Sequence, residues 1–233
     1  AARKVLGNHI NQAGAKKDID KANIDLTHYQ SITGEELEMI EEEANRLVKK
    51  AIPVQSNFLP RTEAEQTYGM NIYQGGAVPG KVLRIINIKG VDAEACGGTH
   101  LNNTAEAGQI KILKAAKISD GIVRLYFTAG EAAQKESRKE KEILEEASRL
   151  LNVKISQLPA RANELFEKWK LAKKSVEKKK KINLEELELK SKEEFKGNVL
   201  DKISEILKTQ PEHVVKTIKR FLNELEDTKR KLE

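Results

Sequence analysis

"GQIKILKAAKI", residues 108–118, and "GIVRLYFTAG", residues 121–130, decide the fold of the first part of the chain. Both are β-type runs bounded by glycine and aspartate, a pattern typical of antiparallel strands. "KVLRIINI", residues 81–88, has the same character and follows a proline and a glycine. The sequence therefore predicts an antiparallel sheet before residue 130.

A helix accompanies these strands. "GEELEMIEEEANRLVKK", residues 34–50, carries acidic residues in its first turns and lysines in its last, which suits the helix dipole. Its apolar residues recur at helical spacing, at Leu37, Ile40, Ala44, Leu47 and Val48. The first part of the chain is therefore expected to be an α+β domain, over residues 1–130.

The pattern changes after Gly130, where almost every segment has helical period and few breakers interrupt it. One apolar stripe comprises Leu158, Ala162, Leu165, Phe166, Trp169, Ala172 and Val176, and another comprises Val214, Val215, Ile218, Phe221, Leu222 and Leu225. Residues 131–233 are therefore expected to form an all-α hairpin or bundle. Packing the two stripes against each other in an antiparallel hairpin would bury Trp169.

The two stripes resemble each other when they are shifted by 56 residues, which aligns Leu158 with Val214 and Leu165 with Phe221. Each unit consists of a short helix, a break near Pro159 or Pro211, and a long helix. A true internal repeat and the convergence of two amphipathic hairpins both explain the match. Residues 200–233 could equally be a lineage-specific insertion.

Composition limits the function classes. Hydrophobic residues make up 39% of the chain and charged residues 33%, without a long apolar run or a secretory pattern. We expect no membrane partner and a cytoplasmic location. Most of the formal net charge of +6 lies in the helical part, including the run "KKSVEKKKK", residues 173–181. Such a run is usually a solvated helix face, and a phosphate-facing patch is the sharper alternative.

The motif "DAEACGGTHLNN", residues 92–103, places the only cysteine, Cys96, four residues before His100. Cys96 could be a buried apolar residue, a nucleophile or a metal ligand. Thiolate and imidazole suit zinc, but zinc sites use at least three protein ligands, and this motif supplies two. His9 and His28 could approach it, whereas His213 is expected on the surface.

Three stretches resemble the editing domain of alanyl-tRNA synthetases of the archaeal type. They are "ARKVLGNHINQAGAKKDIDKANIDLTHY" (2–29), "EACGGTHLNNTAEAGQIKI" (94–112) and "SDGIVRLYFTAGEAA" (119–133). Free-standing alanyl-tRNA editing proteins share this domain, and the threonyl enzyme shares it distantly. The resemblance is close over roughly residues 1–150, and Cys-Gly-Gly-Thr-His in this setting is highly specific.

The resemblance implies a zinc ion bound by Cys96 and His100 together with an H-x-x-x-H pair expected a few residues upstream of Ala1. It implies hydrolysis of seryl or glycyl esters of tRNA(Ala), for which zinc can position the substrate and polarise a water. Gln12 matches a position that projects into the editing pocket and could meet the serine hydroxyl, although it could instead cap a helix end. Gly97 and Gly98 would admit the terminal adenosine, and Thr99 would hold the loop.

Residues 131–233 resemble, more weakly, the helical region that links editing to a dimerisation and tRNA-binding domain. tRNA(Ala) and a second copy of the chain are thus the expected partners. ATP would be used only by the aminoacylation domain, which these residues lack. The alternative function is a non-catalytic tRNA-binding or dimerisation module with an incomplete zinc site.

Overall fold

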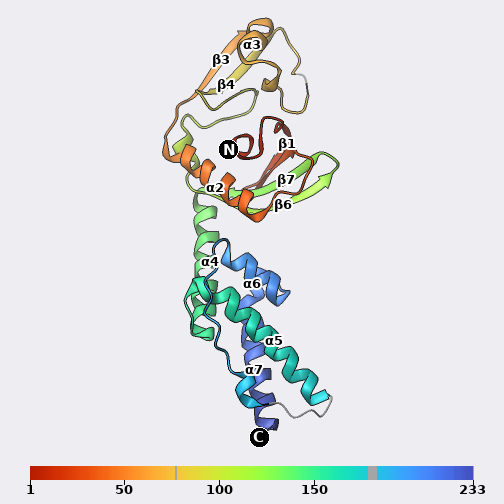
Figure 1. The fold of residues 1–233 in the computed structure, drawn as a ribbon. Coiled ribbons are helices and arrows are strands. Elements are labelled where there is room, and N and C mark those ends of the chain that lie inside the picture. Colours follow the sequence, from red (N-terminus) through yellow and green to blue (C-terminus); the bar gives the residue numbers. More distant parts are fainter. Residues whose placement is uncertain (77, 178–182, 233) are drawn as a thin grey trace. The chain divides into compact units, whose positions relative to one another are not determined.

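The computed structural model describes residues 1–76, 78–177 and 183–232. These residues form two compact units, Ala1–Glu136 and Ser137–Glu233 (Figure 1). The first unit contains two antiparallel sheets with helices, and the second is helical. The predicted fold class, an α+β part with antiparallel strands followed by an all-α part, is therefore confirmed.

The first sheet has four antiparallel strands in the order β1-β2-β7-β6. They are β1 (Gln12–Lys17), β2 (Ala22–Thr27), β7 (Ile122–Ala129) and β6 (Ile110–Ser119). β6 and β7 are the two strands predicted from residues 108–130, and they pair along their whole lengths. The core beside this sheet is formed by Ile10, Leu26, Ile32, Ile40, Val123 and Leu125.

Helix α2 (Gly34–Lys49), predicted from residues 34–50, packs against β6. A capping box begins it: the Glu36 carboxylate accepts from the Thr33 N–H at 2.7 Å, and the Glu36 N–H donates to the Thr33 hydroxyl at 3.3 Å. Asn45 then bonds both backbone groups of Ile110, at 2.7 and 2.9 Å. These contacts fix the helix to the strand that follows the Cys96–His100 loop.

The second sheet has three antiparallel strands in the order β3-β4-β5, namely β3 (Val54–Pro60), β4 (Val82–Ile88) and β5 (Asp92–Ala95). β4 is the strand predicted from residues 81–88. The sheet and helix α3 (Arg61–Tyr68) enclose a small core of Ala64, Ile72, Leu83, Ile85 and Ala95. Shorter elements of this unit are α1 (Ala2–Leu6) and the 3₁₀ helices η1 (Met70–Ile72) and η2 (Thr104–Ala107). β5 leads directly into the cysteine motif.

The second unit contains most of helix α4 (Gly130–Leu151) together with α5 (Leu158–Glu177), α6 (Val199–Leu207) and α7 (Val214–Leu232). The 3₁₀ helices η3 (Ile155–Gln157), η4 (Leu184–Leu187) and η5 (Pro211–His213) connect them. Most residues of the predicted stripes form one core, whose fully buried members include Leu158, Ala162, Leu165, Val214, Ile218 and Phe221. Val176, predicted on the first stripe, is instead exposed and lies outside this core. The periodicity thus identified the faces that pack.

The expected antiparallel packing of the two stripes is wrong. Phe166 stacks on Phe221, and Trp169 Nε1 donates to Glu224 Oε2 at 2.6 Å, so residue numbers rise together and α5 and α7 run in the same direction (Figure 1). Trp169 is half-buried rather than buried, with its ring 4.3 Å from that of Phe221. A stripe defines a helix face, but it does not define the direction of the partner helix.

The two hairpins of this unit, α4–η3–α5 and α6–η5–α7, have the same local geometry at an offset of 56 residues. α4 ends at Leu151 and α6 at Leu207, and α5 begins at Leu158 and α7 at Val214. The residue after α4 or α6, Asn152 or Lys208, is left-handed, with φ of 51° or 52°. The similarity that the sequence suggested therefore extends to backbone conformation. The short first helix predicted for each unit holds only for α6, with 9 residues, because α4 has 22.

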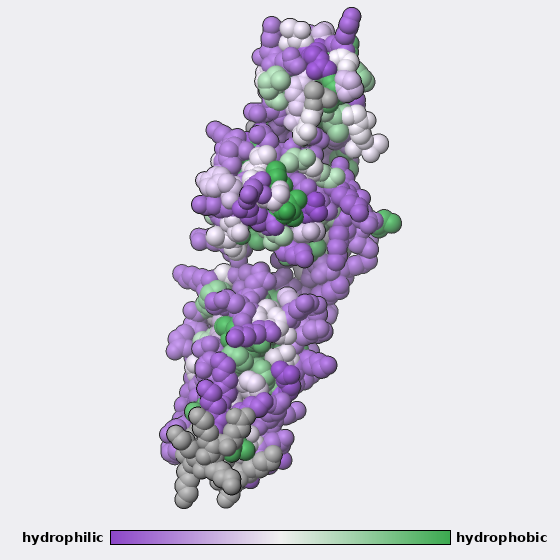
Figure 2. Space-filling view, turned by 90° about the vertical axis from the view of Figure 1, so that its right-hand side faces the viewer, coloured by the Kyte–Doolittle hydropathy of each residue, from purple (hydrophilic) through white to green (hydrophobic). Residues whose placement is uncertain are grey.

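The face of the molecule in Figure 2 is mostly hydrophilic, and its apolar residues are exposed in small separate groups. None of the described helices is long and apolar enough to cross a membrane. Lys173 and Lys174 of the predicted lysine run are exposed on α5. Residues 178–181 of that run lie outside the described residues.

Candidate functional site

The loop that begins at Cys96 is held by one arginine from the neighbouring strand. The Cys96 N–H donates to the Arg84 carbonyl at 3.1 Å, which extends the β4–β5 pairing by one residue. Arg84 Nη1 donates to the carbonyls of Cys96 and Gly98 at 2.9 and 2.6 Å, and its Nε donates to Ser56 Oγ at 2.9 Å. Arg84 thus fixes the path of the loop, a role that the sequence analysis did not assign.

The Cys96–His100 loop presents its side chains to solvent. Cys96 is half-buried, whereas Gly97, Gly98, Thr99 and His100 are exposed. The His100 Nδ1 lies 3.0 Å from the Gly98 carbonyl, which orients the ring. A side chain added at Gly97 would meet no atom within 4 Å. The loop therefore leaves open space beside its backbone.

The donor chemistry of this loop suits zinc, but the described residues do not complete a zinc site. Cys96 and His100 supply one sulfur and one imidazole, whereas zinc sites use three or four protein ligands. Among residues 1–76, 78–177 and 183–232, no group of three or more His, Cys, Asp or Glu side chains is placed to hold a metal ion. The zinc site remains a prediction that involves Cys96 and His100.

Gln12 begins strand β1 and does not cap a helix, since α1 ends at Leu6. Its Nε2 donates to Gln74 Oε1 at 3.0 Å, across 62 residues of sequence. The neighbouring Gly75 has a φ of 77°, and a Cβ there would lie 2.7 Å from the Ala13 carbonyl oxygen. A glycine-rich loop thus lies against β1 and engages the residue expected to meet the substrate.

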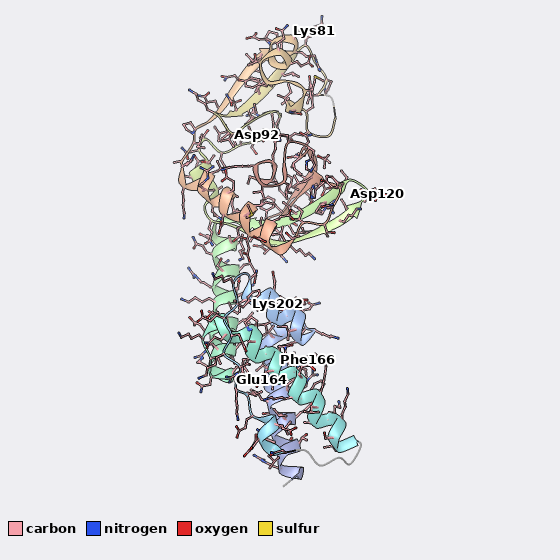
Figure 3. All side chains as sticks on the ribbon, in the orientation of Figure 1. Lys81, Asp92, Asp120, Glu164, Phe166 and Lys202 are labelled. Carbon is pink, nitrogen blue, oxygen red and sulfur yellow. The ribbon has the colours of Figure 1, made fainter. Side chains whose placement is uncertain are left out.

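Two carboxylates lie on β5 immediately before the loop. Burial, together with the nearby charge of Asp92, raises the pKa of Glu94 to about 7, while Arg3 and Lys17 oppose the increase. Asp92, labelled in Figure 3, forms an ion pair with Arg3 at 3.6 Å. Since Lys17 belongs to β1, this electrostatic contact shows that β1 and β5 lie near each other.

His9 and His28 contact each other and not the cysteine motif. The His9 Nε2 and the His28 Nδ1 are 2.9 Å apart, and both rings pack against Tyr29. His28 is buried and His9 exposed. Among the described residues, neither histidine has a recorded contact with Cys96 that would support a role as a ligand beside it.

An apolar cavity of about 310 Å³ opens beside the loop. Leu47, Ile86 and Leu101 contribute to its wall, and His100 is the polar residue that reaches it from the motif. Small-molecule sites in proteins are commonly apolar clefts of about 300–1,000 Å³ with a few polar groups. The cavity therefore places a ligand-sized space next to one of the two predicted metal ligands.

Comparison with known proteins relates both units to one family. The domain described as "Threonyl and Alanyl tRNA synthetase second additional domain" matches residues 83–126. An alanine–tRNA ligase from Methanococcus aeolicus is 48% identical over 206 residues, which are 88% of this chain and 22% of that protein. Alanine–tRNA ligases from Pyrococcus abyssi and Methanocella arvoryzae are each 51% identical over 178 residues, 76% of this chain and 20% of theirs. The chain is a homologue of alanine–tRNA ligases.

The homology to alanine–tRNA ligases includes the candidate site. The matched domain, residues 83–126, spans most of β4, all of β5, the Cys96–His100 loop, β6 and the first half of β7. Gln12 lies outside it. The chain spans about a fifth of the length of the curated alanine–tRNA ligases that it matches.

Proposed function

We propose that residues 1–130 form the part of an alanine–tRNA ligase that hydrolyses seryl or glycyl esters of tRNA(Ala) in the cytoplasm. Water would cleave the ester between the wrong amino acid and the terminal ribose, releasing the amino acid and a free hydroxyl. The observation that carries the proposal is the exposed Cys96–His100 loop, which Arg84 fixes within the matched domain. Open space beside Gly97 gives a ligand access to this loop.

The roles proposed for individual residues follow from the family resemblance. Cys96 and His100 would supply two ligands to a zinc ion. Gly97 and Gly98 would let the terminal adenosine approach, while Thr99 would hold the loop. Gln12 would meet the serine hydroxyl, and its bond to Gln74 would orient its amide. A polar group placed for a substrate hydroxyl discriminates strongly against a substrate without one.

The experiment measures deacylation of seryl- and alanyl-tRNA(Ala) beside zinc content, in a longer chain that includes the H-x-x-x-H pair expected upstream of Ala1. Cys96→Ala should lower both zinc content and seryl-tRNA(Ala) hydrolysis, whereas Cys96→His should retain part of each because imidazole also binds zinc. A nucleophilic cysteine would predict loss of hydrolysis in both variants with zinc retained. Full hydrolysis by a zinc-free Cys96→Ala protein would refute the proposed metal ligand.

Gln12→Ala should keep its zinc and change the ratio of the two deacylation rates. Gln55→Ala is the matched control, because Gln55 is exposed on β3. An unchanged ratio in Gln12→Ala would remove Gln12 from the substrate site.

The second candidate is a non-catalytic tRNA-binding or dimerisation module. A basic pocket in the helical unit favours it, since that pocket is independent of the Cys96–His100 loop. Binding of tRNA(Ala) or self-association without seryl-tRNA(Ala) hydrolysis, even after zinc is added, would select this candidate.

A further inference from the structure

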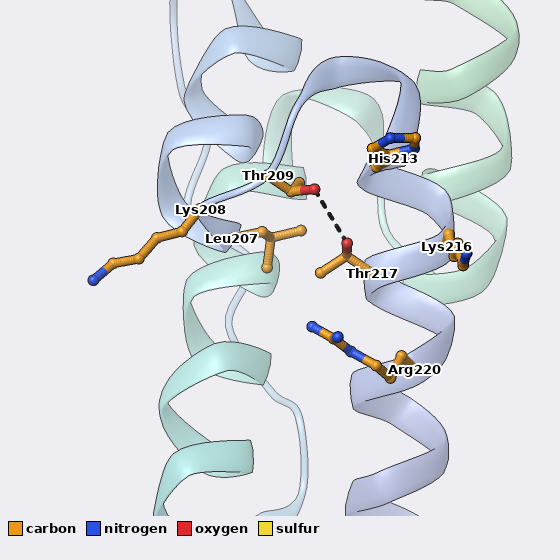
Figure 4. A pocket seen from close by; sticks show the side chains of 7 residues that line it. All are labelled: Leu207, Lys208, Thr209, His213, Lys216, Thr217 and Arg220. Carbon is orange, nitrogen blue, oxygen red and sulfur yellow. Dashed lines mark hydrogen bonds between the residues drawn. The ribbon is translucent and has the colours of Figure 1, made fainter.

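The second hairpin of the helical unit contains a pocket of about 440 Å³ near the start of α7 (Figure 4). Thr209 and Thr217 lie in it, joined by a 3.3 Å hydrogen bond between their hydroxyls. Arg220 points into the gap below Thr217, while the Lys208 side chain extends away from it. His213 and Lys216 complete the polar wall.

The pocket is rich in hydrogen-bond donors and contains no carboxylate. Lys208, Lys216 and Arg220 are all exposed, and none forms an ion pair with any residue that the structure describes. Arg220 lies over the Phe221 ring, with its Cζ 4.9 Å from the ring centroid, a contact that uses none of its N–H donors. The positive charge of the pocket is therefore available to a ligand.

The equivalent place in the first hairpin shows what such a groove can hold. There, an extended segment of the chain lies along α5. Arg161 donates to the Ser191 carbonyl at 2.8 and 3.0 Å, and Glu164 accepts the N–H groups of Lys190 and Ser191, each at 2.8 Å. The Phe195 N–H continues this contact by donating to the Ser156 carbonyl at 2.8 Å. The first groove thus binds a peptide backbone through one donor and one acceptor side chain.

The 56-residue offset places Thr217 where the first hairpin has Arg161, and Arg220 where it has Glu164. The second groove therefore has an arginine where the first groove has the carboxylate that accepts peptide N–H groups. A peptide backbone bound there would leave its N–H groups without that acceptor, at a cost. A phosphodiester presents only acceptor oxygens, which match guanidinium, ammonium and hydroxyl donors.

We propose that the pocket formed by Thr209, His213, Lys216, Thr217 and Arg220 binds a backbone phosphate of RNA. The inference rests on the proposed function in one respect, since that function makes tRNA(Ala) the RNA that this chain would meet. Arg220 is the central contact because its planar guanidinium can donate two hydrogen bonds to one phosphate. Lys208 and Lys216 belong to the same lining and add positive charge.

The test measures the affinity of the chain for tRNA(Ala) between about 50 and 300 mM KCl, with deacylation of seryl-tRNA(Ala) as a separate readout. Losing one phosphate contact reduces the slope of log K against log salt by about 1. We expect Arg220→Ala to weaken binding roughly 3- to 10-fold at low salt and to lower the slope accordingly. Lys216→Ala combined with Arg220→Ala should lower both further.

Arg230→Ala is the matched control, because Arg230 is an exposed arginine on the same helix outside the pocket. It should change the affinity less than about 2-fold. Denaturation followed by the fluorescence of Trp169, the only tryptophan, checks that each variant is folded. A second probe, inorganic phosphate, should shift the amide resonances of Thr209 and Thr217 saturably in the unmutated chain but not in Arg220→Ala.

The outcomes separate this proposal from the proposed function. Normal RNA affinity in both pocket variants would overturn the pocket proposal and leave editing untouched. Arg220-dependent binding without deacylation would overturn editing alone. Failure of the unmutated chain to bind tRNA(Ala) would overturn both. Tighter binding of a poly-glutamate peptide than of RNA, lost in Arg220→Ala, would overturn the RNA assignment in favour of an acidic protein segment.

Discussion

Replacing Glu164 with glutamine should loosen the extended segment that lies along α5. Glu164 lies on α5, and its side chain is 16% exposed (Figure 3). Its carboxylate accepts hydrogen bonds from the backbone of Lys190 and Ser191, from the Ser191 hydroxyl and from Lys168. The neutral amide of Glu164→Gln has one acceptor oxygen in place of two and no charge. Several of these bonds would therefore be lost or weakened.

The magnitude follows from the pKa. Burial by itself would raise the pKa of Glu164, but the hydrogen bonds from Lys168, Ser191 and Lys190 outweigh it and lower the pKa from 4.5 to about 2. A pKa decrease of that size corresponds to a contribution of at most about 3 kcal/mol to the free energy of unfolding at neutral pH. Solvent screens a side chain near the surface, so we expect Glu164→Gln to lower the free energy of unfolding by about 1–2 kcal/mol at pH 7.

The same reasoning fixes the sign of the pH dependence. The folded-state pKa of Glu164 is depressed, so its stabilising contribution is fully present above pH 4.5 and is lost as the pH falls toward 2. The difference in unfolding free energy between the unmutated chain and Glu164→Gln should therefore shrink over this range. Comparing the two proteins at each pH cancels the contribution of every other carboxylate that the substitution leaves unperturbed.

The assay is urea denaturation at several pH values, monitored by the fluorescence of Trp169, which lies in the same core as the segment. Glu167→Gln is the control, since Glu167 is 60% exposed on the same helix and pairs only with Lys170 among the described contacts. It should change stability by less than about 0.5 kcal/mol. Equal stability of Glu164→Gln and the unmutated chain at pH 7, or a difference that persists unchanged at pH 2, would refute the reasoning.

Three further predictions concern backbone and packing. Gly75→Ala should destabilise the first unit by about 1–3 kcal/mol, because the added Cβ would lie 2.7 Å from the Ala13 carbonyl oxygen of β1. The same substitution should alter the ratio of seryl- to alanyl-tRNA(Ala) deacylation. The control Gly76→Ala, whose added Cβ would meet no atom within 4 Å, should change neither quantity. Leu165→Ala should cost about 2–5 kcal/mol of unfolding free energy because Leu165 is fully buried, whereas Leu171→Ala, at a 42% exposed position, should cost far less. Lys208→Gly should raise the denaturation midpoint, because glycine adopts the left-handed conformation of residue 208 without the strain of about 1 kcal/mol that a side chain causes. It should weaken RNA binding only slightly.

The regular elements with strong apolar patterns were predictable from the sequence. β6, β7 and β4 appeared as β-type runs, and α2 appeared as an amphipathic helix with charges that suit its dipole. β1 and β2 gave no such pattern. Their burial is set by pairing with each other and with β7, and most of β1 is exposed, so no local alternation marks it.

The candidate site was predictable only where its residues are neighbours in sequence. Cys96 and His100 lie on one short loop, so their proximity follows from spacing. The partner of Gln12 is Gln74, which only the packing of a distant loop against β1 brings near. Arg84 looks like any strand residue until its strand pairs with β5. These contacts depend on which distant segments pair or pack together. The periodicity of a single sequence does not reveal that pairing.

The similarity of the two hairpins connects the structural and the functional observations. Their corresponding helix ends share one backbone conformation and an offset of 56 residues. In the first hairpin, a carboxylate and a guanidinium hold the chain's own segment. In the second, an arginine stands in place of the carboxylate and a threonine in place of the guanidinium, so no carboxylate lines the groove to accept peptide N–H groups. The first groove holds a carboxylate paired with the chain's own backbone, whereas the second holds an exposed arginine without a carboxylate partner among the described residues, and this difference is what points to an anionic ligand.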